Sequence, residues 1–171
     1  MKVLVAFASK HGATEEIARS IGEILGGSGL TVEVKRMEDV DTVLPYNAFV
    51  LGSAIYMGSW LRKARHFIDA HAELLARQPT WIFSSGPIGS PPHPAAAESF
   101  NVDDLMATTR ARDHQLFSGK LDRAELGLAE RALTGALHVP SGDYREWDAV
   151  TAWATAIART LESEAISVAA K

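Results

Sequence analysis

The sequence predicts an α/β protein, a three-layer sandwich in which a five-stranded parallel sheet lies between two layers of helices. Three observations lead to this prediction. Short apolar runs alternate with amphipathic segments of helical spacing along the chain. The first run, Val3–Ala8, is apolar at every position, as expected of a central strand that is buried on both faces. No internal repeat or linker interrupts this order, so the 171 residues are predicted to form one domain.

A helix and a short strand are expected directly after this first strand. Apolar positions that share one helical face predict the helix: Ile17, Ala18, Ile21, Ile24 and Leu25. Thr14 is expected to cap its start, and Gly26–Gly27 is expected to end it. The alternation over Thr31–Val34 predicts the second strand.

The middle of the chain predicts two further strands with a helix between them. Phe49–Leu51 is expected to form the third strand, which ends at Gly52–Ser53. The periodicity of Ser59–Leu75 predicts a helix, and Trp81–Phe83 predicts the fourth strand. The proline-rich stretch Gly89–Pro94 is expected to be a loop.

The last third of the chain predicts two helices, one strand and a segment of mixed character: Val102–Arg110, Gln115–Phe117, 121–139 and Asp143–Leu161. Asn101 is expected to cap the first of these helices. Trp147 and Trp153 fall on one face of the final helix and are expected in the core.

Composition excludes several kinds of function. Because the chain has no cysteine, disulfides, thiol redox chemistry and cysteine-ligated metal centres are excluded, and redox chemistry would need a bound cofactor. The net charge of -4 argues against a nucleic-acid partner. His66 and His71 are five positions apart rather than four, so no metal site is predicted, and no catalytic side chain can be assigned from spacing.

The expected location follows from the absence of long apolar runs. Val3–Ala8 is too short for a secretory signal or a transmembrane helix, and later apolar stretches are interrupted by charge or glycine. The chain is therefore predicted to be cytoplasmic, with peripheral membrane contact and the oligomeric state left open.

Candidate site residues follow the first, third and fourth predicted strands, whose carboxyl ends meet at one edge of the sheet. The first loop precedes a helix start, where backbone N–H groups, hydroxyls and a glycine suit an anion such as a terminal phosphate. It comprises Ser9, Lys10, His11, Gly12, Ala13 and Thr14. A simple capping loop is an equally open interpretation, and Lys10 and His11 are expected on the rim rather than in catalysis.

The second and third loops extend this edge. The second offers aromatic and thioether cover for a flat ring, and comprises Ser53, Ala54, Ile55, Tyr56, Met57 and Gly58. The third offers backbone groups for a polar ring edge, and comprises Ser84, Ser85, Gly86, Pro87 and Gly89. The alternative for Tyr56, and equally for Trp60, is that these rings merely cover the following helix.

Together these loops resemble the flavodoxin family. The first loop is similar to that family's phosphate pattern Ser/Thr-x-Thr-Gly-x-Thr, with His11 in place of the second threonine. The segment around 118–142 resembles the insertion of long-chain flavodoxins. Stretches 52–58, 61–68 and 143–148 resemble flavodoxin-domain proteins of the menaquinone-dependent protoporphyrinogen oxidase type. The resemblance implies a flavodoxin-like sandwich over residues 1–171 with FMN as cofactor.

The function implied is an FMN-binding oxidoreductase that passes electrons between a reductant and a quinone-like or other acceptor. The alternative is a non-enzymatic electron carrier that serves protein partners, and a third hypothesis is a sensor or scaffold without flavin. The resemblance also places the Met57–Gly58 peptide near the flavin N5. Because Gly58 has no Cβ, this peptide is expected to turn readily and to offer the Met57 carbonyl to N5–H after one-electron reduction.

Overall fold

The computed structural model describes residues 1–56, 58–86, 102–121 and 142–169. Its main sheet has parallel strands in the order β2-β1-β3-β5-β6. These strands are β1 (Lys2–Ala8), β2 (Thr31–Arg36), β3 (Ala48–Tyr56), β5 (Thr80–Ser85) and β6 (His114–Phe117). The chain moves from β1 to one side and then returns to build the other side. This reversal creates a switch point between β1 and β3, where open α/β sheets bind ligands.

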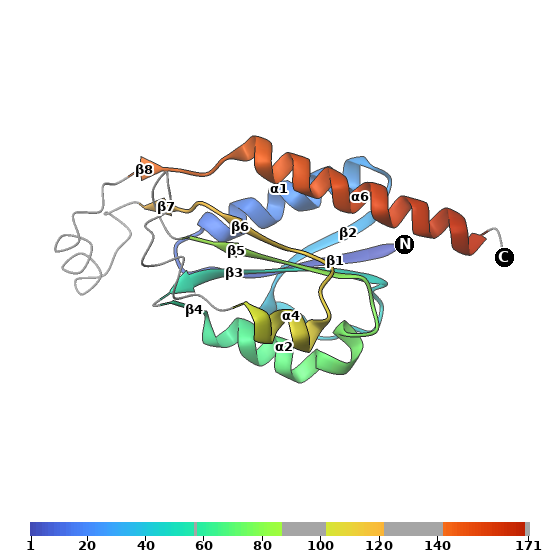
Figure 1. Cartoon of the computed structure of the whole chain (residues 1–171), viewed down its shortest axis with the longest axis horizontal. Coiled ribbons are helices and arrows are strands. Elements are labelled where there is room, and N and C mark those ends of the chain that lie inside the picture. Colours follow the sequence, from blue (N-terminus) through green and yellow to red (C-terminus); the bar gives the residue numbers. More distant parts are fainter. Residues whose placement is uncertain (57, 87–101, 122–141, 170–171) are drawn as a thin grey trace.

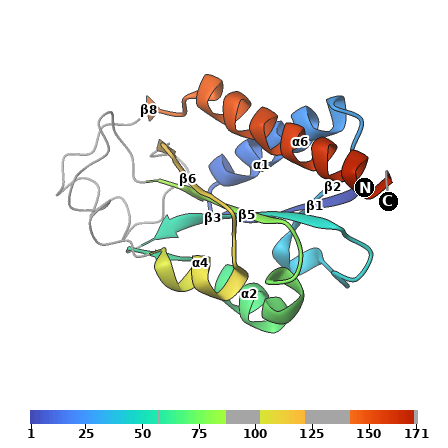
Figure 2. The ribbon, with the colours of Figure 1, turned by 45° about the vertical axis from the view of Figure 1, so that its right-hand side comes forward.

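Helices cover both faces of the sheet, which confirms the predicted fold class. Helices α1 (Ala13–Gly27) and α6 (Trp147–Ala169) lie on one face, and α2 (Arg62–Leu75) and α4 (Asp103–Thr109) lie on the other (Figures 1 and 2). A short 3₁₀ turn, η1 (Met37–Asp39), connects β2 to the segment before β3.

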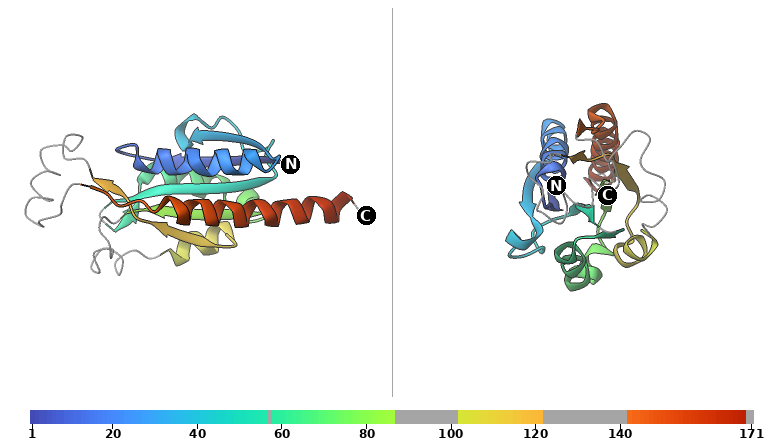
Figure 3. Two further views of the ribbon diagram at one scale, coloured as in Figure 1. Left: turned by 90° about the horizontal axis from the view of Figure 1, so that it is seen from above. Right: turned by 90° about the vertical axis from the view of Figure 1, so that its left-hand side faces the viewer.

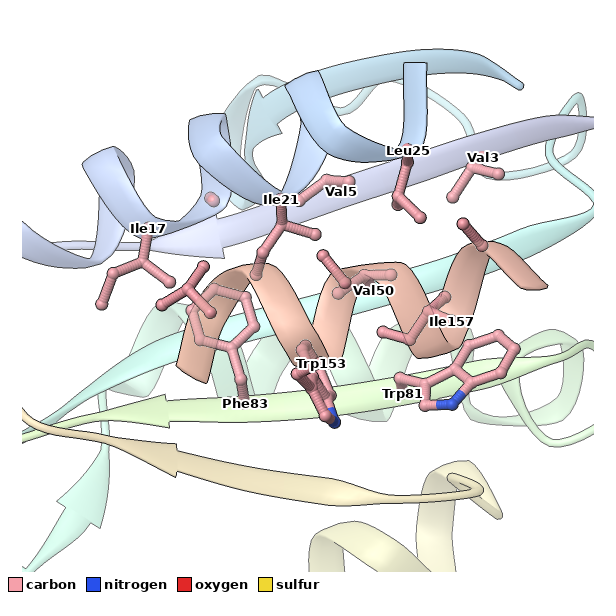
Figure 4. Packing of buried hydrophobic residues seen from close by; sticks show 14 of the residues in the cluster. Val3, Val5, Ile17, Ile21, Leu25, Val50, Trp81, Phe83, Trp153 and Ile157 are labelled. Carbon is pink, nitrogen blue, oxygen red and sulfur yellow. The ribbon is translucent and has the colours of Figure 1, made fainter. Parts of the chain in front are cut away.

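The core has one apolar layer on each side of the sheet, because the central strands are apolar on both faces. Val3 and Val5 belong to the layer under α1 and α6, whereas Leu4 and Ala6 belong to the layer under α2. Figure 4 shows the first layer, where side chains of both helices meet those of the strands: Ile17, Ile21, Leu25, Trp153, Ile157, Val5, Val50 and Phe83. This confirms the interpretation of Val3–Ala8 as a central buried strand.

Two short antiparallel pairings lie beyond the carboxyl ends of the parallel strands. Strand β4 (Ser59–Trp60) folds back on the end of β3, with Ile55 opposite Trp60. Strand β7 (Lys120–Leu121) pairs with β8 (Gly142–Asp143). Figures 1 and 3 show both pairings at the end of the sheet opposite to the two chain termini.

The second predicted loop is wrong as a loop, because β3 continues through it. Residues 52–56 form strand, and Ser59–Trp60 belongs to β4 rather than to the following helix. Pairing explains the extension: Ala54 lies opposite Ser85 on β5, and Tyr56 lies opposite Ser59 on β4. Ser53–Tyr56 therefore lie on a strand that pairs with β4, which holds them more rigidly than a loop would.

Three predictions about helix ends are also corrected. Helix α1 starts after Gly12 rather than with Thr14 as its cap, because Gly12 takes a left-handed φ of 81° that turns the chain into the helix. Helix α6 starts at Trp147 rather than Asp143, which is in β8. Trp147 is exposed, whereas Trp153 is buried as predicted. The residue before α4 is Val102, and Asn101 lies outside the described residues.

Within the described ranges, no helix has the length and apolar character that crossing a membrane requires.

Candidate functional site

A left-handed glycine lies in each of the three candidate segments at the carboxyl end of the sheet. The φ angles are 81° at Gly12, 71° at Gly58 and 103° at Gly86. Such angles strain any residue that has a Cβ, so these positions favour glycine. The three segments lie at the carboxyl ends of β1, β3 and β5, which are neighbours in the sheet, and residues 53–56 and 84–85 belong to the strands themselves rather than to loops. The predicted loops therefore meet at one edge, with backbone groups turned by glycines.

The first loop is held by a hydrogen bond within itself. The Gly12 N–H donates to Ser9 Oγ at 3.0 Å, and the Gly12 carbonyl accepts the Glu16 N–H at 3.0 Å. No side chain caps α1 at Gly12. A Cβ on Gly12 would have no atom within 4 Å, so there is open space beside this residue. The positive end of the α1 dipole lies next to Gly12, as an anion site requires.

The acidic residues in the first turn of α1 are neutralised by arginines. Glu15 pairs with Arg19 at 2.8 Å and also with Arg36. Glu16 pairs with Arg145 at 2.7 Å. Because these carboxylates are paired, their repulsion of an anion at the helix start is reduced.

Arg145 connects the segment after β8 to the start of α1. Its side chain is only 4% exposed, and it donates to both Asp143 oxygens, from Nε at 2.8 Å and from Nη2 at 2.6 Å. Its third bond reaches Glu16, and its guanidinium carbon lies 4.6 Å from the centroid of the Trp147 ring. The guanidinium holds the pKa of Asp143 below its usual range, and Asp143 raises the pKa of Arg145. Arg145 thereby fixes the position of the first turn beside the loop.

Tyr56 and Lys10 join the first and second segments. Tyr56 is the last residue of β3 and is 38% exposed. The Lys10 Nζ lies 4.0 Å from the centroid of the Tyr56 ring. The ring of Trp60, by contrast, is buried in the apolar layer under α2. Of the two interpretations of this ring, the structure therefore supports packing against the following helix.

Three hydrogen-bonded side chains connect the β3–β4 hairpin to the neighbouring strands. The Trp60 Nε1–H donates to Ser84 Oγ at 2.8 Å, and Ser84 Oγ also lies 2.9 Å from His114 Nε2. Because the Ser84 oxygen accepts from Trp60, its own hydrogen is available for a neutral His114 nitrogen. Burial lowers the pKa of His114, and the nearby Asp113 carboxylate opposes this shift. Together the three side chains tie β4, β5 and β6.

The serines of the second and third segments face the interior. Ser53 is fully buried; its Oγ accepts the Leu61 N–H at 3.1 Å and donates to the Ala54 carbonyl at 2.9 Å. At the edge of the sheet, a Cβ on Gly86 would lie 3.8 Å from the Ile55 carbonyl, so the third segment lies against the second. Ser85 is buried beside it, whereas Met57, Pro87 and Gly89 lie outside the described residues.

This arrangement fits FMN. The uncapped helix start and the open space at Gly12 suit a terminal phosphate, and an exposed aromatic ring stands at the adjacent strand end. A family model described as a flavodoxin domain matches residues 4–146. The chain belongs to this family. It is therefore an FMN-binding flavoprotein that functions in electron transfer.

Solved structures share the fold of this flavodoxin-domain chain. A flavodoxin from the domain Archaea matches with a TM-score of 0.60 and 17% identity, over 95% of this chain and 99% of that chain. A mutant flavodoxin from Pseudomonas aeruginosa gives 0.60 and 16%, with coverage of 95% and 99%. The rubredoxin oxygen:oxidoreductase of Desulfovibrio gigas gives 0.61 and 16%, over 95% of this chain but 36% of that chain. A search of curated proteins found no match.

Sequence reasoning missed the supporting residues Arg145 and His114. A signal existed for Arg145, which lies two positions after Asp143 and two before Trp147, but its partner Glu16 is 129 positions away. Nothing in the sequence places His114 beside Ser84, which lies 30 positions earlier in the chain.

Proposed function

We propose that this chain is an FMN-dependent oxidoreductase that passes electrons between a reductant and a quinone-like or other small acceptor. The main support is that three left-handed glycines, the uncapped start of α1 and the exposed Tyr56 ring belong to neighbouring strand ends. When bound, FMN supplies the electron exchange itself. The protein residues are left to bind the cofactor, orient it and control its contact with water.

In this proposal the first loop holds the phosphate. The N–H groups of Ala13 and Thr14, at the start of α1, would open toward it. Ser9 Oγ accepts the Gly12 N–H, so its hydrogen remains for a phosphate oxygen. Lys10 and His11 stand at the rim, as the sequence predicts.

The other two segments would hold the ring. Tyr56 provides the aromatic cover, Ala54 and Ile55 precede it on β3, and the third segment, at Ser85 and Gly86, would lie at the polar edge of the ring. Met57, Pro87 and Gly89 stay predicted contacts outside the described residues. Ser53 and Ser84 act indirectly in this proposal, since their hydroxyls bond Leu61 and Trp60 and so hold the hairpin.

The predicted role of the Met57–Gly58 peptide near the flavin N5 has one supporting observation. Gly58 has a φ of 71°, which a side chain would make costly. We expect Gly58→Ala to change the separation between the two one-electron potentials of bound FMN, measured by anaerobic titration. An unchanged separation would remove the predicted role of this peptide.

An electron carrier that serves protein partners is the second candidate. The matches to flavodoxins across 99% of their own length favour it, because nothing in those chains exceeds the shared fold. The narrower likeness to the menaquinone-dependent protoporphyrinogen oxidase type is a proposal that rests on the sequence resemblance alone.

Two experiments test these functions in order. First, the apoprotein is titrated into FMN; quenching of flavin fluorescence with a saturable 1:1 endpoint is expected, and no quenching would contradict the FMN site. Second, the photoreduced holoprotein is mixed with menadione or with cytochrome c, and reoxidation is followed by absorbance. Free reduced FMN is the control. Acceleration by menadione above that control favours the oxidoreductase, whereas acceleration by cytochrome c alone favours the carrier.

The extent of the domain is also proposed. We infer that residues 1–171 form one domain and that the segment around 118–142 is an insertion. In support, β7 and β8 pair at its two ends, and the Tyr144 N–H donates to the Gly119 carbonyl at 3.2 Å, so the chain leaves and returns at one place. A cytoplasmic location stays a prediction.

A further inference from the structure

Lys10 and Tyr56 connect the two halves of the proposed site. The Lys10 ammonium lies 4.0 Å from the centroid of the Tyr56 ring, within the distance of about 6 Å at which a cation is attracted to an aromatic face. Lys10 belongs to the loop before α1, and Tyr56 ends the neighbouring strand β3. A positive charge is therefore held where the phosphate loop meets the aromatic cover.

The surroundings make this charge significant. Lys10 is the only lysine or arginine among the residues predicted to contact the cofactor. The carboxylates in the adjacent first turn, Glu15 and Glu16, are bonded to arginines. The Lys10 ammonium would interact electrostatically with the charge of a bound cofactor, and solvent would screen this interaction only in part.

We propose that Lys10 is a determinant of the cofactor's reduction potential, and that its ammonium, seated on Tyr56, favours the reduced form of FMN. This inference rests on the proposed FMN site. Uptake of two electrons from an external donor such as dithionite, with one proton from water, adds one negative charge to the cofactor. A nearby cation stabilises the more negative state, so Lys10 raises the two-electron potential.

The test compares variants of the holoprotein. Lys10→Met removes the charge and keeps much of the side-chain volume, and Lys10→Arg keeps the charge. We expect Lys10→Met to lower the ratio of reduced to oxidised FMN affinity about tenfold, which is a fall of about 30 mV in the two-electron potential. Lys10→Arg keeps the wild-type potential, and added salt makes the Lys10→Met shift smaller.

The chain offers a matched control at the opposite end of the sheet. The Lys2 Nζ lies 4.9 Å from the centroid of the Tyr46 ring, so Lys2→Met removes the same kind of contact far from the site. We expect it to leave the potential unchanged.

The outcomes separate this inference from the proposed function. The potential is measured against a reference dye, and fluorescence quenching gives the affinity for oxidised FMN. If Lys10→Met weakens oxidised and reduced FMN equally, Lys10 contributes only to binding and the inference is overturned, while the FMN site stands. An equal shift in Lys2→Met overturns it as a general charge effect. If the wild-type chain binds no FMN, both the inference and the proposed function fail. Lys10→Gln replaces Lys10→Met if circular dichroism shows that the latter is unfolded.

Discussion

The two ends of the sheet each carry a lysine over a tyrosine ring, but the two pairs are built differently. At the amino end, Tyr46 is only 4% exposed and its hydroxyl donates to Glu33 Oε2 at 2.6 Å. Glu33 also pairs with Lys2 at 2.6 Å and with Lys35 at 3.1 Å. At the carboxyl end, Tyr56 is 38% exposed at the end of its strand, beside the turn that contains Gly58.

This difference suggests that one tyrosine contributes to the stability of the fold and the other to cofactor binding. The amino-end tyrosine is packed on Phe49 and bonded through its hydroxyl, so its contacts are completed within the fold. The carboxyl-end tyrosine presents its ring at an edge where neighbouring segments are turned by left-handed glycines. The same residue types therefore stabilise the domain at one end and are proposed to receive a cofactor at the other.

Replacing each tyrosine by alanine should give the largest difference between the two ends. Tyr46→Ala is expected to cost about 3–5 kcal/mol of unfolding free energy, because it removes a buried ring. Tyr56→Ala should cost about 0.5 kcal/mol or less, but weaken FMN binding about tenfold. Urea unfolding of the apoproteins and FMN fluorescence titration give the two quantities. Equal losses of stability would show that the two rings have the same role.

Two glycines of nearly equal geometry provide the next comparison. Gly12 and Gly29 have φ angles of 81° and 84°, and a Cβ on either would have no atom within 4 Å. Alanine should therefore cost about 1–2 kcal/mol of stability at each position, from backbone strain alone. Only Gly12→Ala should weaken FMN binding, since Gly29 lies in the turn before β2. Thermal unfolding and the same FMN titration are the measurements; an equal loss of affinity in Gly29→Ala would contradict a phosphate site at Gly12.

The sequence was sufficient for the sheet and for the location of the candidate edge. Val3–Ala8 is a short run that is apolar on both faces, a pattern typical of a central strand that is covered on both sides. The alternation of strands and helices then places loops after β1, β3 and β5 at one edge, whatever the lengths of those strands. Periodicity and the order of the elements are both present along the chain itself, so a single sequence is enough to detect them.

The sequence was insufficient where structure depends on distant partners. β3 extends to Tyr56 because Ser85 and Ser59 pair with it, and the residues themselves carry no strong strand pattern. Trp147 shares helical spacing with Trp153, yet it lies at the first turn of α6, beyond the core, and stacks on Arg145. Contacts of this kind arise from packing across the chain, which no local pattern encodes.

The carboxyl half of the sheet should lose stability in acid through His114. Its folded pKa lies below the ordinary value of 6.5, so the neutral form stabilises the fold above pH 6.5. This contribution is lost as pH falls through the lower folded pKa, because protonated His114 can no longer accept from Ser84. His114→Gln cannot titrate. The difference in unfolding free energy between wild type and this variant should therefore shrink by about 0.5–1 kcal/mol as pH falls from 7 to 5. Urea unfolding at both pH values measures this difference; a constant gap would contradict the Ser84–His114 bond.

The amino end should respond to acid in a lower window and by less. Hydrogen bonds from Lys2, Tyr46 and Lys35 lower the pKa of Glu33 from 4.5 to about 2. The ionised carboxylate thus stabilises the fold above pH 4.5, and this stabilisation fades as pH falls toward 2. Because the Glu33 side chain is 34% exposed, solvent should limit the effect to under about 1 kcal/mol. The gap in unfolding free energy between wild type and Glu33→Gln should shrink between pH 6 and pH 3, and shrink at either pH when salt is added. FMN affinity at pH 6 should be the same in both proteins. A loss of affinity in Glu33→Gln would mean that the two ends of the sheet are coupled, and the division between a stabilising end and a binding end would have to be abandoned.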